Sequence, residues 1–170
     1  MVLLLACGNV CAAGTPINQT RVVIVDARID VSNVKGSVTV TGWDKPEVAI
    51  SGTLGEGAKG LSVEGTGDHL AIKVEPPDKL GWFSWGADTH MDNTLLDIKV
   101  PAAAEVKIAV VSADVTLSGV GGRSLNVDGV SGKLHPDSAA KSVEIDTVSG
   151  AVELTGSAQH THIGSVSGHI

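Results

Sequence analysis

The sequence predicts an all-β fold, a right-handed parallel β-solenoid (β-helix-like) with coils of about eighteen residues and less regular N-terminal strands. The triplet Val-Ser-Gly recurs at residues 130–132, 148–150 and 166–168, and the variant Val-Ser-Ala occurs at 111–113. A fixed period of this kind is typical of solenoids, in which each coil buries its apolar face against its neighbours. Apolar and polar residues also alternate within each repeat, which is the period of a strand with one buried face.

Alignment of the repeats places apolar residues in four columns, which we expect to point inward and to stack coil on coil as parallel strands. The columns are Val111, Val130, Val148 and Val166; Val115, Leu134, Val152 and Ile170; Leu125, Val143 and Thr161; and Val127, Ile145 and Ile163. A left-handed β-helix needs an aliphatic residue at every sixth position, and these columns are spaced differently. The right-handed rule for parallel crossovers therefore favours a right-handed coil.

A glycine column and one proline predict local geometry. Gly132, Gly150 and Gly168 mark a corner at which a side chain would be crowded or the backbone needs a positive φ. Pro136 falls in a strand column, and because proline cannot donate a ladder hydrogen bond we expect a bulge there.

The same pattern appears earlier in the chain. Residues 34–42 follow the pattern of residues 148–156, with Lys35 in the place of the serine. We therefore expect the repeat to begin near residue 30, to be interrupted, and to resume near residue 108. The expected strands of the interrupted part are 21–31, 36–41, 47–53, 61–64, 69–74, 95–100 and 106–111.

An aromatic segment lies in the least repetitive part of the chain, residues 75–93. Trp82, Phe83 and Trp85 are three of the four aromatic residues in the sequence. They form a candidate surface for binding sugar rings or a membrane interface. The alternative is that the segment covers an open face of the solenoid, and we favour this alternative because large apolar rings are more often buried than displayed. The fourth aromatic residue, Trp43, is expected to pack over a corner.

The first thirteen residues read as the remnant of a signal peptide, with cleavage after Ala12 or Ala13. The basic start of such a signal is missing, so we expect the natural chain to begin upstream. A competing interpretation is a lipobox at residues 4–7, with Cys7 carrying a lipid anchor. Both predict export to the periplasm or the cell surface. Both cysteines precede the cleavage point, so the mature chain contains no disulfide.

The mature chain, residues 14–170, is expected to be a single β-solenoid domain. Irregular strands and the Trp-rich loop occupy residues 21–107, and the regular repeats occupy 108–170. The sequence stops midway through a repeat without a capping coil, so we expect a C-terminal truncation.

Composition and motifs argue against several classes of function. The formal charge of −7 and the lack of a basic patch argue against nucleic-acid binding, and no stretch is apolar for the length of a membrane span. His160, His162 and His169 are candidate zinc ligands, and Asp128 with Asp146 are candidate calcium ligands, but both sets are too small for a site. No catalytic motif and no cofactor site is predicted, so we do not expect an enzyme.

The repeats of the form Val-Ser-Gly-x-Val-x-Leu, the start Gly-Thr-Pro-Ile at 14–17 and the segment Gly-Trp-Asp-Lys-Pro-Glu-Val at 42–48 resemble one bacterial family. It is the family of β-strand-repeat domains of unknown function labelled “putative adhesins”. The resemblance implies an exported, right-handed β-helix-like fold in the cell envelope. It supplies no catalytic residues.

The sequence therefore predicts an exported, non-catalytic envelope protein that binds an unknown protein or glycan through the flat faces of its solenoid. One alternative is a purely structural module that associates end to end with other copies. A polysaccharide-processing enzyme is the third hypothesis, and it rests on the fold alone.

Overall fold

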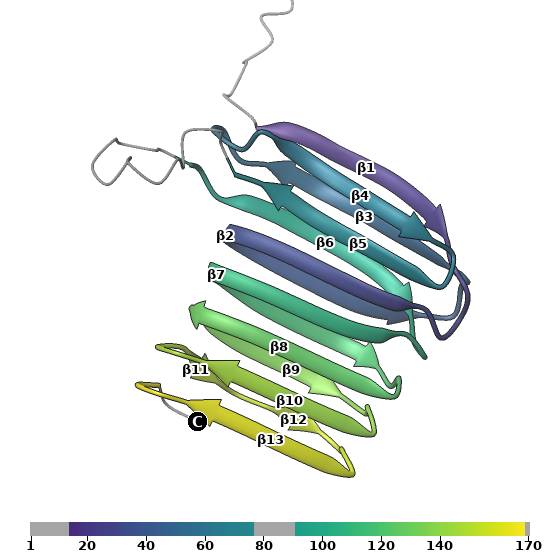
Figure 1. Cartoon of the computed structure of the whole chain (residues 1–170), viewed down its shortest axis with the longest axis vertical. Helices are drawn as coiled ribbons and strands as arrows, with labels where there is room; N and C mark the ends of the chain where they lie inside the picture. The colour runs from purple at the N-terminus through teal and green to yellow at the C-terminus, as the bar shows by residue number, and fades with distance from the viewer. Residues whose placement is uncertain (1–13, 77–90, 169–170) are drawn as a thin grey trace, which may run out of the picture.

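The computed structural model describes residues 14–76 and 91–168, which form thirteen strands and no α-helix (Figure 1). The all-β prediction is confirmed. The strands are β1 (Thr15–Val22), β2 (Arg28–Trp43), β3 (Glu47–Leu54), β4 (Gly60–Thr66), β5 (His69–Glu75), β6 (Thr94–Pro101), β7 (Glu105–Val120), β8 (Ser124–Ser131), β9 (Lys133–Ser138), β10 (Ser142–Thr147), β11 (Ala151–Val152), β12 (Thr155–Gly156) and β13 (His160–Ser165). The two ranges contain no helix that could span a membrane.

The strands build two facing layers that share the long strands β2 and β7 (Figure 1). The first halves of β2 and β7 pair with β5 and β8, and their second halves pair with β6 and β9. The first layer continues from β8 to β10 and β13, and the second from β9 to β11 and β12. Each successive pair of strands therefore stacks on the pair before it.

Parallel pairing dominates the C-terminal part. Ser142 of β10 lies opposite Ser124 of β8 on one side and His160 of β13 on the other, so residues eighteen apart in sequence become neighbours in space. The N-terminal part contains antiparallel pairs as well: β1 with β3, β3 with β6, and β4 with β5. The sheet is thus mixed, and a purely parallel stack describes only part of the molecule.

The early strand β2 lies between strands that come much later in the chain. It pairs in parallel with β7 along almost its whole length, with Arg28 opposite Glu105 and Thr41 opposite Ser118. On its other side it pairs with β5 and β6. The predicted likeness of residues 34–42 to the later repeats is explained by this arrangement, because β2 is itself one coil of the stack.

The core lies between the two layers and consists of aliphatic side chains. Ile29, Ile72, Ile98, Ile108 and Ile145 are among the largest fully buried residues. They alternate with exposed or half-buried residues along each strand, as the period of two requires. Three of the four predicted inward columns point into this core where the structure describes them, except that Thr161 is exposed and Ile163 half-buried in β13. Ile170 lies outside the described residues.

The predicted inward direction of the side chains in the fourth column is wrong. Val111, Val130, Val148 and Val166 stack as expected, but their side chains are exposed on the outer surface. The reason is strand parity: Val127 points inward, so Val130, three residues later, must point outward while the backbone stays extended. The corner of the coil begins only after the valine.

Two smaller predictions have clear outcomes. The predicted strand 21–31 is wrong, because the chain turns at residues 23–27, where the Ala27 N–H donates to the Ile24 carbonyl at 3.2 Å. The predicted bulge is confirmed: Leu117 pairs with Pro136, and the register shifts before Val120 pairs with Ser138.

Candidate binding groove

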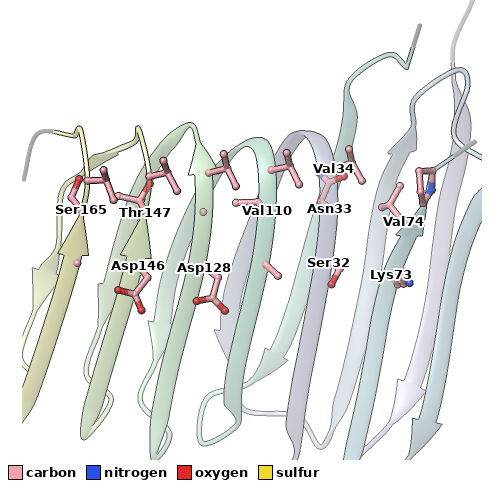
Figure 2. Close-up of a pocket in the computed structure, with 18 residues that line it drawn as sticks. Ser32, Asn33, Val34, Lys73, Val74, Val110, Asp128, Asp146, Thr147 and Ser165 are labelled. Carbon is pink, nitrogen blue, oxygen red and sulfur yellow. The ribbon is translucent and has the colours of Figure 1, made fainter. Parts of the chain in front are cut away.

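An open groove crosses the outer surface of the first layer near the corner of the coils (Figure 2). It has a volume of about 760 Å³ and runs over β5, β2, β7, β8, β10 and β13, across the strands rather than along them. Three rows of residues line it, one residue of each row from almost every strand. The valine row is Val34, Val111, Val130, Val148 and Val166; the middle row is Val74, Asn33, Val110, Gly129, Thr147 and Ser165; and the acidic row is Lys73, Ser32, Ala109, Asp128, Asp146 and Gly164.

The valine row forms an apolar wall. Val111, Val130 and Val148 are each about 45% exposed and Val166 is 79% exposed, while Val34 packs partly against the core. Consecutive members lie one strand spacing apart, about 4.8 Å, so their methyl groups form a continuous strip. Contiguous exposed apolar surface of this kind is characteristic of interaction sites.

The corner that follows the valines is held by hydrogen bonds that repeat from coil to coil. The backbone N–H of Ser149 donates to the Val130 carbonyl at 2.8 Å, and that of Ser167 donates to the Val148 carbonyl at 2.8 Å. The Thr147 hydroxyl also accepts from the N–H of Gly150, at 3.1 Å. These contacts keep the valines in line, so the apolar wall is a fixed feature of the scaffold.

The opposite wall is acidic. Asp128 and Asp146 lie side by side in the register of β8 and β10, as the sequence predicts. Asp128 forms an ion pair with Lys107, with 3.6 Å between Nζ and Oδ2. Asp146 forms no ion pair within the described ranges, and its carboxylate extends over Gly164, where it would overlap any Cβ.

Two other cationic side chains of the first layer already form ion pairs. Arg28 pairs with Asp30 at 3.3 Å, and Arg123 pairs with Glu105 at 3.0 Å. Lys73 lies at the far end of the groove from Asp146, on β5 (Figure 2). The groove therefore has an apolar side, an acidic side and one cationic end.

Asn33 is a buried polar residue in the middle row. Its side chain is 2% exposed, and neither atom of its amide group has a hydrogen-bond partner. In β10 and β13 the equivalent positions hold Thr147 and Ser165, whose hydroxyls accept the N–H of the glycine three residues later. A buried amide without partners is energetically costly.

The site residues singled out from the sequence have different outcomes. Trp82, Phe83 and Trp85, and with them both interpretations of the aromatic segment, lie outside the described residues, as do Cys7 and His169. Trp43 is half-buried at a corner, as predicted, and its indole N–H donates to the Glu47 carbonyl at 2.8 Å. His160 and His162 are exposed on β13. No three His, Cys, Asp or Glu residues within 14–76 and 91–168 converge as a metal site.

The groove itself was not predicted. Its signal was present in the valine column, which sequence reasoning assigned to the core. The outward position of Asp128, two residues before Val130 on the same strand face, would have corrected that assignment.

Comparisons with known proteins support the fold. Residues 87–170 match a protein-family model described as Toastrack DUF4097. No curated protein matches the chain. The crystal structure of a “putative cell adhesion protein” from Clostridium sporogenes matches with a TM-score of 0.63 and 13% sequence identity, covering 92% of this chain and 98% of that one. At this identity, the likeness shows the shared fold alone.

Two further structures are more distant. A “putative adhesin” from Bacteroides fragilis has a TM-score of 0.37 at 14% identity, with 91% of this chain and 94% of that chain covered. A “putative lipid binding protein” from Parabacteroides distasonis has a TM-score of 0.33 at 10% identity, with 92% and 97% covered. Scores this low add nothing to the assignment of the fold.

Proposed function

Because the chain carries a Toastrack DUF4097 domain across residues 87–170, we propose that it is an exported, non-catalytic binding module of the bacterial cell envelope. The resemblance to the family labelled “putative adhesins” agrees with this match and with the name of the Clostridium sporogenes structure, which has the same fold. The proposed attachment surface is the groove between the valine row and the acidic row.

The exposed valine row is the observation that carries the proposal. Four valines in line are exposed to solvent beside a corner whose hydrogen bonds recur in the C-terminal coils. Burying one valine side chain contributes about 1.5 kcal/mol or more, so a partner that covers the row gains substantially.

A binding role also fits the chemistry of the described residues. Two histidine–carboxylate contacts in the described residues, His69 with Asp30 at 2.8 Å and His135 with Glu153 at 3.3 Å, are solvent-exposed and lie outside the groove. The name of the Clostridium sporogenes structure refers to cell adhesion, not to a reaction. These observations support a partner-binding module over a polysaccharide-processing enzyme.

Several finer features belong to the same proposal. We place the protein in the periplasm or at the cell surface, exported by the signal remnant at residues 1–13. The coils are proposed to wind right-handedly, with about eighteen residues each in the C-terminal part. The partner is a protein or a glycan of the envelope.

An attachment assay tests the role of the groove. Beads coated with the protein are applied to arrays of immobilised bacterial glycans and synthetic peptides, and retention is measured under flow. We expect retention on at least one array, and loss of that retention in the double variant Val130→Ser and Val148→Ser. The matched control replaces two other exposed apolar residues, Val22→Ser and Ile24→Ser, which lie away from the groove.

Equal thermal midpoints establish that each variant is folded. Retention that survives in the groove variant, or the absence of retention on both arrays, contradicts the proposal. Shortening of an immobilised glycan during the assay would favour the enzyme instead.

A further inference from the structure

The dimensions of the groove restrict what it can hold. It crosses six strands, so at about 4.8 Å per step it is about 24 Å long. Its two walls are outward residues two apart on the same strands, such as Asp128 and Val130, which places them about 7 Å apart. An extended chain can lie along this line with its side chains over the two rows.

The two walls differ in chemistry, so the occupant must differ on its two sides. Val130 and Val148 present methyl groups on one side, and Asp128 and Asp146 present carboxylates on the other. Covering Asp146 without a counter-charge would desolvate a carboxylate that has no cation of its own in the described chain. The occupant therefore has an aliphatic side and a cationic side.

An extended polypeptide can supply both sides through its period of two. Successive side chains point in opposite directions, so a segment that alternates aliphatic and basic residues has one aliphatic edge and one cationic edge. At about 3.3 Å per residue, seven residues fill the groove. We propose that the groove binds such a segment of a partner protein, with its aliphatic side chains on the valine row and its Lys or Arg side chains at Asp128 and Asp146. This inference rests on the proposed binding role of the groove.

Charge disfavours the main alternative occupants. A second copy of this chain carries a formal charge of −7 and would bring acidic surface to an acidic wall. A stable dimer also needs about 800 Å² per partner, more than so narrow a groove supplies. Nucleic acids and anionic lipids are repelled by the same two aspartates.

Fluorescence anisotropy with defined peptides tests the proposal. The probe is a fluorescein-labelled, amidated heptapeptide that alternates Val and Lys, and the control peptides replace every Lys by Glu or every Val by Ser. We expect the Val–Lys peptide to bind at least tenfold more tightly than either control. The variant Asp128→Asn with Asp146→Asn should weaken binding at least tenfold, whereas Asp97→Asn with Asp137→Asn, two exposed carboxylates of the other layer, should not.

Each other outcome overturns the inference in a defined way. Equal binding of the Ser–Lys peptide removes the role of the valine row, and equal binding of the Val–Glu peptide removes the role of the aspartates. A dimer in sedimentation that Val130→Ser and Val148→Ser abolish makes a second copy the occupant. Binding seen only after Trp82, Phe83 and Trp85 are replaced by Ser makes the chain's own segment the occupant.

The inference and the proposed function fail separately. If no peptide binds but the groove variant still loses attachment in the bead assay, the peptide proposal is wrong and the binding role stands. If the groove variant attaches like the unaltered protein, both are wrong.

Discussion

Asn33 is a buried polar residue whose amide is expected to lower the stability of the fold. Its amide is buried without a partner, and Val110 on β7 lies opposite it in the β2–β7 register. Asn33→Val removes the unpaired polar group and places valine beside valine. We expect the free energy of unfolding to rise by about 1 kcal/mol, measured by urea denaturation.

Asn126→Val is the matched control for this change. Asn126 is half-buried and donates to Glu144 at 3.3 Å, so its replacement should alter stability by less than about 0.5 kcal/mol. A loss of stability in Asn33→Val would mean that the amide is paired in solution.

The pKa of Asp68 is lowered by hydrogen bonds within its own turn. In the turn between β4 and β5, the Thr66 hydroxyl donates to the carboxylate of Asp68, and this hydrogen bond is the main cause that lowers the pKa of Asp68. A carboxyl group whose pKa is lowered by folding stabilises the native state above its unfolded pKa, and this contribution is lost as the pH falls through the folded pKa. Because Asp68 is fully exposed, the effect on stability is small.

Thr66→Val should raise the pKa of Asp68 toward its ordinary value, as measured by NMR titration of the carboxyl carbon. Thr66→Ser keeps the hydroxyl and should leave the pKa low. An unchanged pKa in Thr66→Val would show that the backbone hydrogen bonds, not the hydroxyl, are the main cause.

Within one coil, Gly132 and Gly129 differ in whether their backbone positions can accept a side chain. Gly132 has φ of 140°, and an added Cβ would overlap the Ala113 carbonyl oxygen. Gly129, three residues earlier, has an ordinary φ, and its Cβ would make a normal contact with Leu134 at 3.5 Å. We expect Gly132→Ala to lower the free energy of unfolding by more than about 1 kcal/mol and Gly129→Ala to leave it nearly unchanged. Equal thermal midpoints for the two variants would contradict this account of the corner.

The packing between coils can be tested at Ile145. This residue is fully buried in β10, between Val127 of β8 and Ile163 of β13. Ile145→Asp places an unpaired carboxylate in the core and should cost about 4 kcal/mol or more. Glu144→Asp, at the exposed neighbouring position, should be nearly silent.

Hydrogen exchange of the Ile145→Asp variant measures how many coils lose amide protection. Because each coil is held mainly by its neighbours, the amides of β8 and β13 should lose protection together with those of β10. Loss confined to β10 would mean that the coils are stable one by one.

The sequence allowed the regular coils to be predicted, because their spacing repeats in the chain. Val127, Ile145 and Ile163 were placed in one column, and the structure aligns them in one register. Val130 and its column were misplaced, since a repeat shows that residues stack but not which way they point. The direction of Val130 follows from counting alternate residues along the strand: Val127 points inward and Asp128 outward, so Val130 points outward.

Pairing between distant segments could not be predicted. Nothing local in β2 specifies that it lies between β6 and β7, and the antiparallel strands β3 and β4 follow from that insertion. The groove was missed for a related reason, because its rows come from six strands spread over most of the chain.

For the whole molecule, the insertion of β2 makes the N-terminal half part of the stack. The family match begins at residue 87 and so excludes β2, although β2 pairs with thirteen residues of β7. We expect a fragment of residues 87–170 to lack cooperative unfolding by circular dichroism, because the edges of β6 and β7 are left without the strand that joins them. Adding a peptide of residues 28–43 should restore part of the signal.

Deletion of β1 is the control for this fragment. β1 pairs only with β3, at the edge of the described sheet, so its removal should lower the thermal midpoint without abolishing cooperative unfolding. A fragment of residues 87–170 that unfolds cooperatively on its own would show that β2 is dispensable.

The position of β2 in the sheet also determines when its strand pairings can form during synthesis. Its neighbour β5 begins with His69, opposite Arg28, and its other neighbour β7 begins with Glu105, also opposite Arg28, which is 77 residues later in the chain. At a synthesis rate of about 5–20 residues per second, β2 waits about 4–15 s for its last partner. Pairings at such long sequence separation also form slowly. The coils are therefore stacked in one order in space and completed in another order in time, starting from the middle of the stack.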